Sequence, residues 1–328
     1  MMSMNVPSSP PARRRLRDRL FVLGLLALVG AGLIGLASAT GWEETWAQLS
    51  RLSLIQIGGL LALSLVNYLL RSWRWHMLAG RLGLPTAFLQ NMRHYLGGFA
   101  MSVTPGRVGE LVRMRWLRRE TGWAVERTAP LVLMDRAGDL AAMAMILGLA
   151  VSLAAGGIAG ALPVTLLALG AAVVVTRPRL LSAVITLSYR ATGRFKRLFG
   201  RARGAARLLQ RFSHGPTMLA VLGLGLIGWM AEGYAFHLLL VWLGADIGLW
   251  KAVAIFVFST LAGGLTGAPG GLGGAEAAMV ALLSLDGVPL EVSVPATAVI
   301  RLTTLWFAIA IGLAVFPFAE RKSLEGLA

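Results

Sequence analysis

The sequence predicts an all-α polytopic membrane protein, and three observations support this prediction. Hydrophobic residues make up 56% of the 328 residues, and only 14% are charged. Several apolar runs are about 20 residues long, which is enough to cross a bilayer as a helix. The chain also holds 40 glycines, which are common in packed transmembrane helices. We expect about six or seven spanning helices, plus two re-entrant broken-helix hairpins in an inverted repeat.

The distribution of charge supports a membrane location and excludes several other classes of protein. The net charge is +16, but the basic residues stand in short stretches between apolar runs. Such stretches mark the cytoplasmic side of a membrane protein, so we expect no nucleic-acid partner. Because the chain contains no cysteine, disulfides, thiol catalysis and thiolate metal sites are excluded. We expect no metal and no cofactor.

The first part of the chain is expected to leave the cytoplasm and return to it. Residues 1–19 form a basic, disordered tail, and the uncharged run 20–40 is expected to be an uncleaved first span. The acidic stretch 41–50 is expected outside, and 52–70 is the second span. Its return to the cytoplasm is marked by Arg71, Arg74 and Arg81.

A less apolar segment, 86–118, follows, with breaks at Gly97-Gly98 and Pro105-Gly106. Positive charge at both of its ends predicts a re-entrant hairpin that enters from the cytoplasm. Residues 129–154 and 160–176 are expected to cross outward and back. The segment 180–189 is too short to span and is expected along the membrane interface.

The second part of the chain repeats this pattern. Residues 190–211 hold eight Lys and Arg and no acid, which predicts the main cytoplasmic loop. Residues 217–242 cross outward, and the glycine-interrupted segment 250–285 is expected to be a second hairpin, entering from outside. Residues 293–318 return to a cytoplasmic tail, 319–328. The prediction is thus one domain, 20–318, in a bacterial-type inner membrane with both termini in the cytoplasm.

The two hairpins carry matching motifs. Pro105-Gly106-Arg107-Val108-Gly109-Glu110 in the first corresponds to a Pro269-Gly270 stretch ending at Glu276 in the second. Arg136 follows Glu110 by 26 residues, and Arg301 follows Glu276 by 25. Two repeats, 52–154 and 217–318, that enter the membrane from opposite sides would form an inverted repeat, which many secondary transporters share. Upstream, His76 and Gly83 match His237 and Gly244.

Charged side chains inside spans are the candidate functional residues, because each costs at least about 2.5–3.5 kcal/mol at the bilayer centre. Arg136 and Arg301 are suited to bind a lipid phosphate. Glu110 and Glu276, the acids of the two hairpins, have two alternative roles. They either bind a cationic headgroup or only neutralise Arg136 and Arg301. The full set is Glu110, Asp135, Arg136, Asp139, Glu232, Glu276 and Arg301.

Two further arginines flank the first hairpin turn. Each of them either contacts lipid phosphates on the cytoplasmic side or only anchors the interface by extending its charged end toward water. Arg107 is the candidate for phosphate contact, and the anchor role is favoured for Arg113. Pro105, Gly106, Pro269 and Gly270 are secondary candidates, since a broken helix in a membrane is tolerated where it lines a cavity or is packed in protein.

These motifs resemble the transmembrane region of lysylphosphatidylglycerol synthases, also called the flippase-like domain. The resemblance rests on the two Pro-Gly…Glu hairpins, on Arg71-Ser72-Trp73-Arg74-Trp75 and on Asp135-Arg136 with Asp139, and it covers about residues 20–318. It implies movement of an aminoacylated phospholipid to the outer leaflet, with Glu110, Arg136, Glu276 and Arg301 in the lipid path. The chain stops at Ala328, so the soluble synthase domain is not expected.

Three functions remain open from the sequence. The first is a translocator or handler of a phospholipid, an aminoacyl-phospholipid or a polyisoprenoid or hopanoid-type lipid. The second is a non-catalytic subunit that docks a lipid- or glycan-synthesis enzyme. The third, a membrane-embedded headgroup transferase, ranks last because no ATPase motif, nucleophile elbow or metal motif is present, so we do not expect an enzyme.

Overall fold

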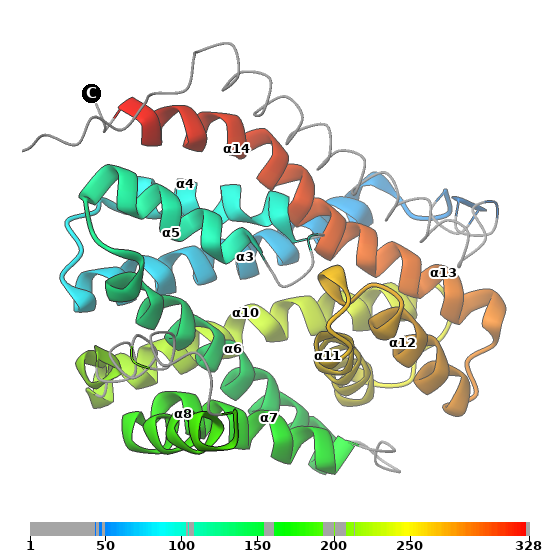
Figure 1. Ribbon diagram of the computed structural model, residues 1–328. Helices are drawn as coiled ribbons and strands as arrows, with labels where there is room; N and C mark the ends of the chain where they lie inside the picture. Colours follow the sequence, from blue (N-terminus) through cyan, green and yellow to red (C-terminus); the bar gives the residue numbers. More distant parts are fainter. Residues whose placement is uncertain are drawn as a thin grey trace, which may run out of the picture.

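The computed structural model describes residues 43, 46, 47, 50–102, 104, 108–153, 161–192, 200, 208–212 and 214–325 (Figure 1). Helices connected by short turns form this part of the chain, and it contains no strand. The expected first span, 20–40, and most of the basic loop 190–211 lie outside the described residues. The prediction of an all-helical membrane protein is confirmed.

The first half is built from two long helices that flank two short ones. Helix α3 spans Leu54–Leu82, α4 spans Phe88–Gly97, the 3-10 turn η1 spans Gly98–Met101, α5 spans Val108–Thr121 and α6 spans Val125–Leu153. A capping box starts α3, in which Ser53 and Gln56 bond each other's backbone N–H. The predicted break at Gly97-Gly98 is the point where α4 gives way to η1.

Among the described residues, two helices and a short turn connect the halves. Helix α7 spans Ala161–Thr176, α8 spans Pro178–Thr192 and the 3-10 turn η3 spans Leu209–Phe212. The axes of α7 and α8 meet at 97°. Exposed Leu180, Val184 and Leu187 recur at helical spacing along α8.

The second half has the same order of elements. Helix α10 spans Gly215–Trp242, α11 spans Leu249–Leu265, η4 spans Pro269–Gly271 and α12 spans Gly274–Leu285. A long rod follows, formed by α13 (Leu290–Arg301), the π turn η5 (Leu302–Trp306) and α14 (Phe307–Glu325). Each half therefore reads as a long helix, a broken hairpin of two short helices and a second long element.

Four of these elements are long and apolar enough to cross a membrane: α3, α6, α10 and the Leu290–Glu325 rod. The bent pair α7 and α8 raises the number to five in the described residues if it counts as one span. The chain is thus a multi-pass helical membrane protein. The expected number of six or seven spans stays a prediction, because one of those spans lies outside the described residues.

The matching ends of α3 and α10 agree with the predicted repeat. Gly83 (φ 85°) and Gly244 (φ 80°) both adopt a left-handed conformation that terminates their helices. In each case the next residue's N–H bonds to a carbonyl five positions earlier, from Leu84 to Ala79 and from Ala245 to Leu240.

The two long helices pack side by side in opposite directions (Figure 1). Gly225 on α10 lies against the Arg74 side chain on α3, whereas Gly228, further along α10, lies against Asn67, which comes earlier on α3. An inverted repeat requires this antiparallel relation of the first helix of each half. The orientation of the hairpins relative to the bilayer stays a prediction.

The ends of the two hairpins meet inside the bundle. A Cβ added to Gly270 of η4 would lie 3.5 Å from the carbonyl oxygen of Ser102, just after η1. A Cβ on Gly312 of α14 would lie 2.1 Å from the backbone nitrogen of Ala100. Glycine at position 312 therefore lets α14 press directly on the η1 backbone.

Candidate functional site

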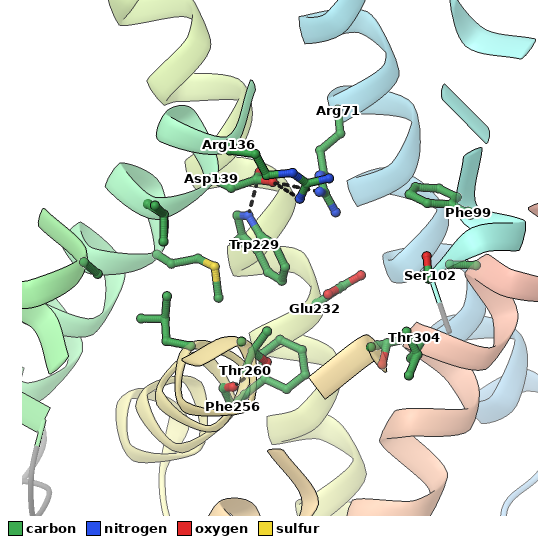
Figure 2. Close-up of a pocket in the computed structure, with 18 of the residues that line it drawn as sticks. Arg71, Phe99, Ser102, Arg136, Asp139, Trp229, Glu232, Phe256, Thr260 and Thr304 are labelled. Carbon is green, nitrogen blue, oxygen red and sulfur yellow. Dashed lines mark hydrogen bonds and ion pairs between the residues drawn. The ribbon is translucent and has the colours of Figure 1, made fainter. Parts of the chain in front are cut away.

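A cavity of about 450 Å³ lies between the two halves, beside the meeting point of the hairpins (Figure 2). Its walls come from both halves and from α7. A volume in this range is typical of a small-molecule or headgroup site. Its charged lining residues are four arginines and two acids, namely Arg71, Arg113, Arg136, Arg301, Asp139 and Glu232.

Asp139 organises one end of the cavity. Its Oδ2 accepts a hydrogen bond from Arg71 at 2.7 Å, and its Oδ1 accepts one from Arg74 at 2.7 Å. The indole of Trp229 donates to the same Oδ1 at 3.1 Å, while Arg136 Nη1 lies 3.3 Å from Oδ2. One carboxylate thus joins α3, α6 and α10. The cluster is drawn at one end of the cavity in Figure 2.

A second ion pair lies behind this cluster. Arg74 is fully buried, and its Nε and Nη2 both donate to Asp135 Oδ1, at 2.9 and 2.6 Å. The Tyr95 hydroxyl donates to the other oxygen of Asp135 at 3.3 Å. Gly138 and Gly225 leave room for the guanidinium, since a Cβ on either would lie within 3.4 Å of Arg74 Nη1. This pair fixes the contact between α3 and α6.

The second broken hairpin is held by Arg301. Its Nε donates to Glu276 Oε1 at 2.5 Å, and its Nη2 donates to the carbonyl oxygen of Gly270 at 2.9 Å. Gly270 has a φ of 61°, so its backbone turns sharply where the hairpin breaks. Arg301 also lines the cavity, so the same side chain holds the hairpin together and forms part of the candidate site.

Glu232 occupies the middle of the cavity. It is 4% exposed, and Figure 2 shows its carboxylate between Trp229 and Thr304. Tyr68, also in the lining, donates its hydroxyl to the carbonyl oxygen of Thr304 at 2.5 Å. That carbonyl belongs to the π turn η5, a type of turn often found at functional sites.

Arg113 corrects an expectation from the sequence. We expected it to extend toward water at the interface, but it is 3% exposed and lines the cavity. Its guanidinium carbon lies 4.0 Å from the ring centre of Tyr95, 5.5 Å from that of Trp75 and 5.7 Å from that of Phe99. Cation–π attraction to three rings stabilises the charge away from water. Gly98 makes this possible, because a Cβ there would lie 2.3 Å from Arg113 Nε.

The remaining walls are mainly apolar, and part of them reaches the outer surface. Leu167 of α7 and Leu265 of α11 both line the cavity, and they are 56% and 63% exposed. The cavity therefore extends to the bundle exterior between α7 and α11.

The structure brings together five of the twelve candidate residues at the cavity, namely Arg136, Asp139, Glu232, Gly270 and Arg301. Asp135 and Glu276 contact arginines just behind the lining. Pro269 begins η4. Pro105, Gly106 and Arg107 lie outside the described residues. Glu110 lies in α5, but its side chain is outside the description, so its pairing with Arg136 stays a prediction.

Sequence reasoning missed Arg71, Arg74 and Trp229 as site residues. The sequence predicts the two arginines at the cytoplasmic end of a span that stops at residue 70. The helix instead continues to Leu82 with both arginines buried, because Asp135 and Asp139 neutralise them. A signal was present: Arg71 and Arg74 are three residues apart and Asp135 and Asp139 four apart, so each pair shares a helix face.

The fold and the cavity define a class: a polytopic integral membrane protein with a charged cavity between two matching halves. The family model of the lysylphosphatidylglycerol synthase TM region matches residues 21–312 of the chain. The chain belongs to this family, as the resemblance of its hairpin motifs had indicated.

Two similar proteins come from Methanothermobacter thermautotrophicus (strain Delta H), and each is described as a UPF0104 membrane protein. One is 34% identical over 99 residues, which is 30% of this chain and 29% of the relative. The other is 25% identical over 118 residues, which is 36% of this chain and 35% of the relative. The chain thus spans about a third of the length of the curated relatives that it matches.

Proposed function

We propose that this protein moves a lipid with a phosphate-bearing, anionic headgroup between the two leaflets of the membrane. The single observation that carries the proposal is the cavity, where four arginines and two acids line a space inside an otherwise apolar bundle. A planar guanidinium binds phosphate oxygens through paired hydrogen bonds. The excess of cations in a low-dielectric region favours an anion.

Access from the side supports a lipid as the cargo rather than a water-soluble anion. Leu167 and Leu265 stand both in the cavity lining and on the exterior. A headgroup in the cavity can therefore leave its acyl chains outside, between α7 and α11, in contact with the bilayer. A soluble phosphate has no such apolar part, and exposed leucines would contribute nothing to its binding.

Arg136 is the residue that we propose to contact the headgroup first. Its side chain is 26% exposed, the most open of the guanidiniums in the Asp139 cluster, and its contact with Asp139 is the longest there, at 3.3 Å. Arg71 and Arg301 make shorter bonds to carboxylates, which hold them in position. We further propose a non-catalytic role, with both termini in the cytoplasm of a bacterial-type inner membrane.

The test is lipid movement in proteoliposomes that contain the purified protein. Fluorescent lipids with anionic, zwitterionic and lysyl headgroups are compared, and a membrane-impermeant quencher reports their transfer between leaflets. We expect the wild type to move the anionic lipid fastest. Arg136→Gln should slow this movement by about tenfold, the effect of losing roughly 1.4 kcal/mol of binding.

A matched control is Arg81→Gln, which removes an exposed arginine outside the cavity lining. This variant should move lipids at the wild-type rate. Absence of movement for every lipid, with the protein shown to be folded, would reject the translocator. Capture of one stable lipid- or glycan-synthesis enzyme by such a protein would then favour the accessory-subunit role.

A further inference from the structure

Glu232 is a buried acid that forms no ion pair with the described residues, although Arg71 and Arg301 line the same cavity. It lies in the middle of α10, is 4% exposed and lines the cavity. The buried ion pairs of the described residues use the other acids of this region, Asp135, Asp139 and Glu276, and Glu232 takes part in none of them. An ionised carboxylate in this position is unfavourable unless a positive group accompanies it.

A buried amide with two unsatisfied atoms lies against the same face of α10. Asn67 of α3 is fully buried beside the Glu232 carboxyl group, and among the described residues neither its Oδ1 nor its Nδ2 reaches a partner with full hydrogen-bond geometry. A Cβ on Gly228 would lie 2.5 Å from Asn67 Oδ1, so the amide touches α10 at this residue. Glu232 follows Gly228 by one helical turn on the same face. The amide and the carboxyl group are therefore neighbours in the contact between α3 and α10.

The hydrogen-bonding capacities of these two groups match only when Glu232 is neutral. An ionised carboxylate accepts hydrogen bonds and donates none, so it leaves Asn67 Oδ1 without a donor. A protonated carboxyl group offers one O–H donor and one carbonyl acceptor, which complement the C=O and NH₂ of a primary amide. Protonation thus satisfies both orphaned atoms of Asn67 and also removes a buried charge that takes part in no ion pair among the described residues.

A proton suits this position better than a metal ion or an organic cation. Within the described residues, no three His, Asp or Glu side chains gather in a way that could hold a metal ion. The charged and phenolic groups of the described residues around this contact are mostly arginines and the acids paired with them, which leave no second carboxylate beside Glu232 to help hold a metal ion or an organic cation. These groups are Tyr68, Arg71 and Arg74 on α3, Asp135, Arg136 and Asp139 on α6, and Arg301 on α13.

We propose that Glu232 carries an exchangeable proton, and that this proton and the anionic headgroup occupy the cavity together. The inference rests on the proposed function of the cavity. A water molecule delivers the proton to a carboxylate oxygen of Glu232, whose charge changes from −1 to zero. The acid then no longer repels a phosphate held by Arg136 and Arg301. When the headgroup leaves, the proton returns to water.

Binding of the two ligands is therefore reciprocal: the proton strengthens headgroup binding, and the headgroup strengthens proton binding. Movement of the anionic lipid should rise as pH falls, by up to about tenfold per pH unit, the limit for one linked proton. A pH gradient across the membrane should then drive the lipid toward the alkaline side.

The first experiment detects the proton without any transport. Infrared difference spectra of the purified protein are recorded between high and low pH, and the carbonyl stretch of a protonated carboxylic acid is followed. We expect a band that is absent in Glu232→Gln and present in Glu291→Gln, which removes an exposed acid at the start of α13. Asn67→Ala should keep the band but move it to higher frequency, because the hydrogen bond to the amide is lost.

The second experiment uses the proteoliposome assay over a range of pH. Glu232→Gln resembles the protonated acid, so it should move the anionic lipid at the low-pH wild-type rate at every pH. Glu291→Gln should keep the wild-type pH dependence. An unchanged pH dependence in Glu232→Gln would overturn the proposal, as would stimulation by Na⁺ at constant pH that depends on Glu232.

The two assays separate the two proposals. If the Glu232 band is present and no lipid moves, the translocator is rejected while the exchangeable proton stands. If lipids move and the band is missing at every pH, the proton proposal is rejected and the translocator stands.

Discussion

Arg301 donates a hydrogen bond of 2.9 Å to the carbonyl oxygen of Gly270, 31 residues earlier in the chain, at the point where the second hairpin breaks. The same guanidinium forms the ion pair with Glu276. A break in a helix exposes a backbone carbonyl that lipid cannot satisfy, and Arg301 supplies the missing donor. The role of Arg301 in the fold is therefore established by its contacts, while its role toward a lipid is a proposal.

Removal of one partner of this ion pair should destabilise the protein. We expect Arg301→Gln to lower the free energy of unfolding by about 3–5 kcal/mol, because Glu276 is left buried without a counter-ion. Thermal unfolding in detergent measures the change. The double variant Arg301→Gln with Glu276→Gln should recover part of the loss. If the double variant is as unstable as the sum of the two single variants, the pair is not the cause.

Among the acids at the contact of α3, α6 and α10, Asp139 should be the one whose substitution lowers the stability of the protein most. It accepts bonds from Arg71, Arg74 and Trp229, so Asp139→Asn removes the charge that neutralises two buried arginines. We expect a loss of about 3–5 kcal/mol in detergent. Asp246→Asn is the matched control at an exposed loop and should change stability by less than about 0.5 kcal/mol. Equal effects of the two substitutions would contradict the assigned network.

The contact of α14 with η1 should tolerate no side chain at position 312. Gly312→Ala would place a Cβ 2.1 Å from the Ala100 nitrogen, so the two segments must separate. We expect a cost of about 1–3 kcal/mol, typical of overpacking. Gly223→Ala in α10 is the control, because a Cβ there meets nothing within 4 Å. A thermal shift of the same size in both variants would argue against the close approach.

The predicted topology can be tested with cysteines, since the natural chain has none. The antiparallel packing of α3 and α10 puts their C-terminal ends on opposite sides of the bundle. An impermeant maleimide added to intact cells should label Asp246→Cys and leave Arg81→Cys unlabelled until the membrane is permeabilised. Labelling of both positions from the same side would contradict two predictions: the inverted repeat and the cytoplasmic location of both termini.

Backbone features were the easiest to predict from the sequence. The break at Gly97-Gly98 lies where the sequence predicted it, although both glycines keep ordinary helical φ angles. Gly83 and Gly244 were predicted only as matching positions of the repeat, and the structure shows that they end their helices. The matching order of elements followed from apolar runs of different length. These properties are encoded within a few residues and need no knowledge of the neighbouring helices.

Side-chain environments were harder, because they depend on partners far along the chain. An arginine near the end of a span is normally assigned to the cytoplasmic side. Arg71 is instead buried because it pairs with Asp139, 68 residues later in the chain, and the local sequence gives no sign of this partner. Arg113 was misplaced for the same reason: its aromatic neighbours come from α3, α4 and η1. The candidates Glu232 and Arg301 were found because a charge within a long apolar run is visible without a partner.

The cavity arginines belong to different halves of the molecule. Arg71 and Arg136 come from α3 and α6, whereas Arg301 comes from α13. Neither half alone therefore sets the spacing between these cations. Their joint attraction for one phosphate depends on distance, so it weakens if the halves shift apart by a few ångströms. The affinity for the headgroup and the relative position of the two halves are then linked. A bound headgroup favours the arrangement in which the arginines are close together, and a shift of the halves away from that arrangement releases the headgroup.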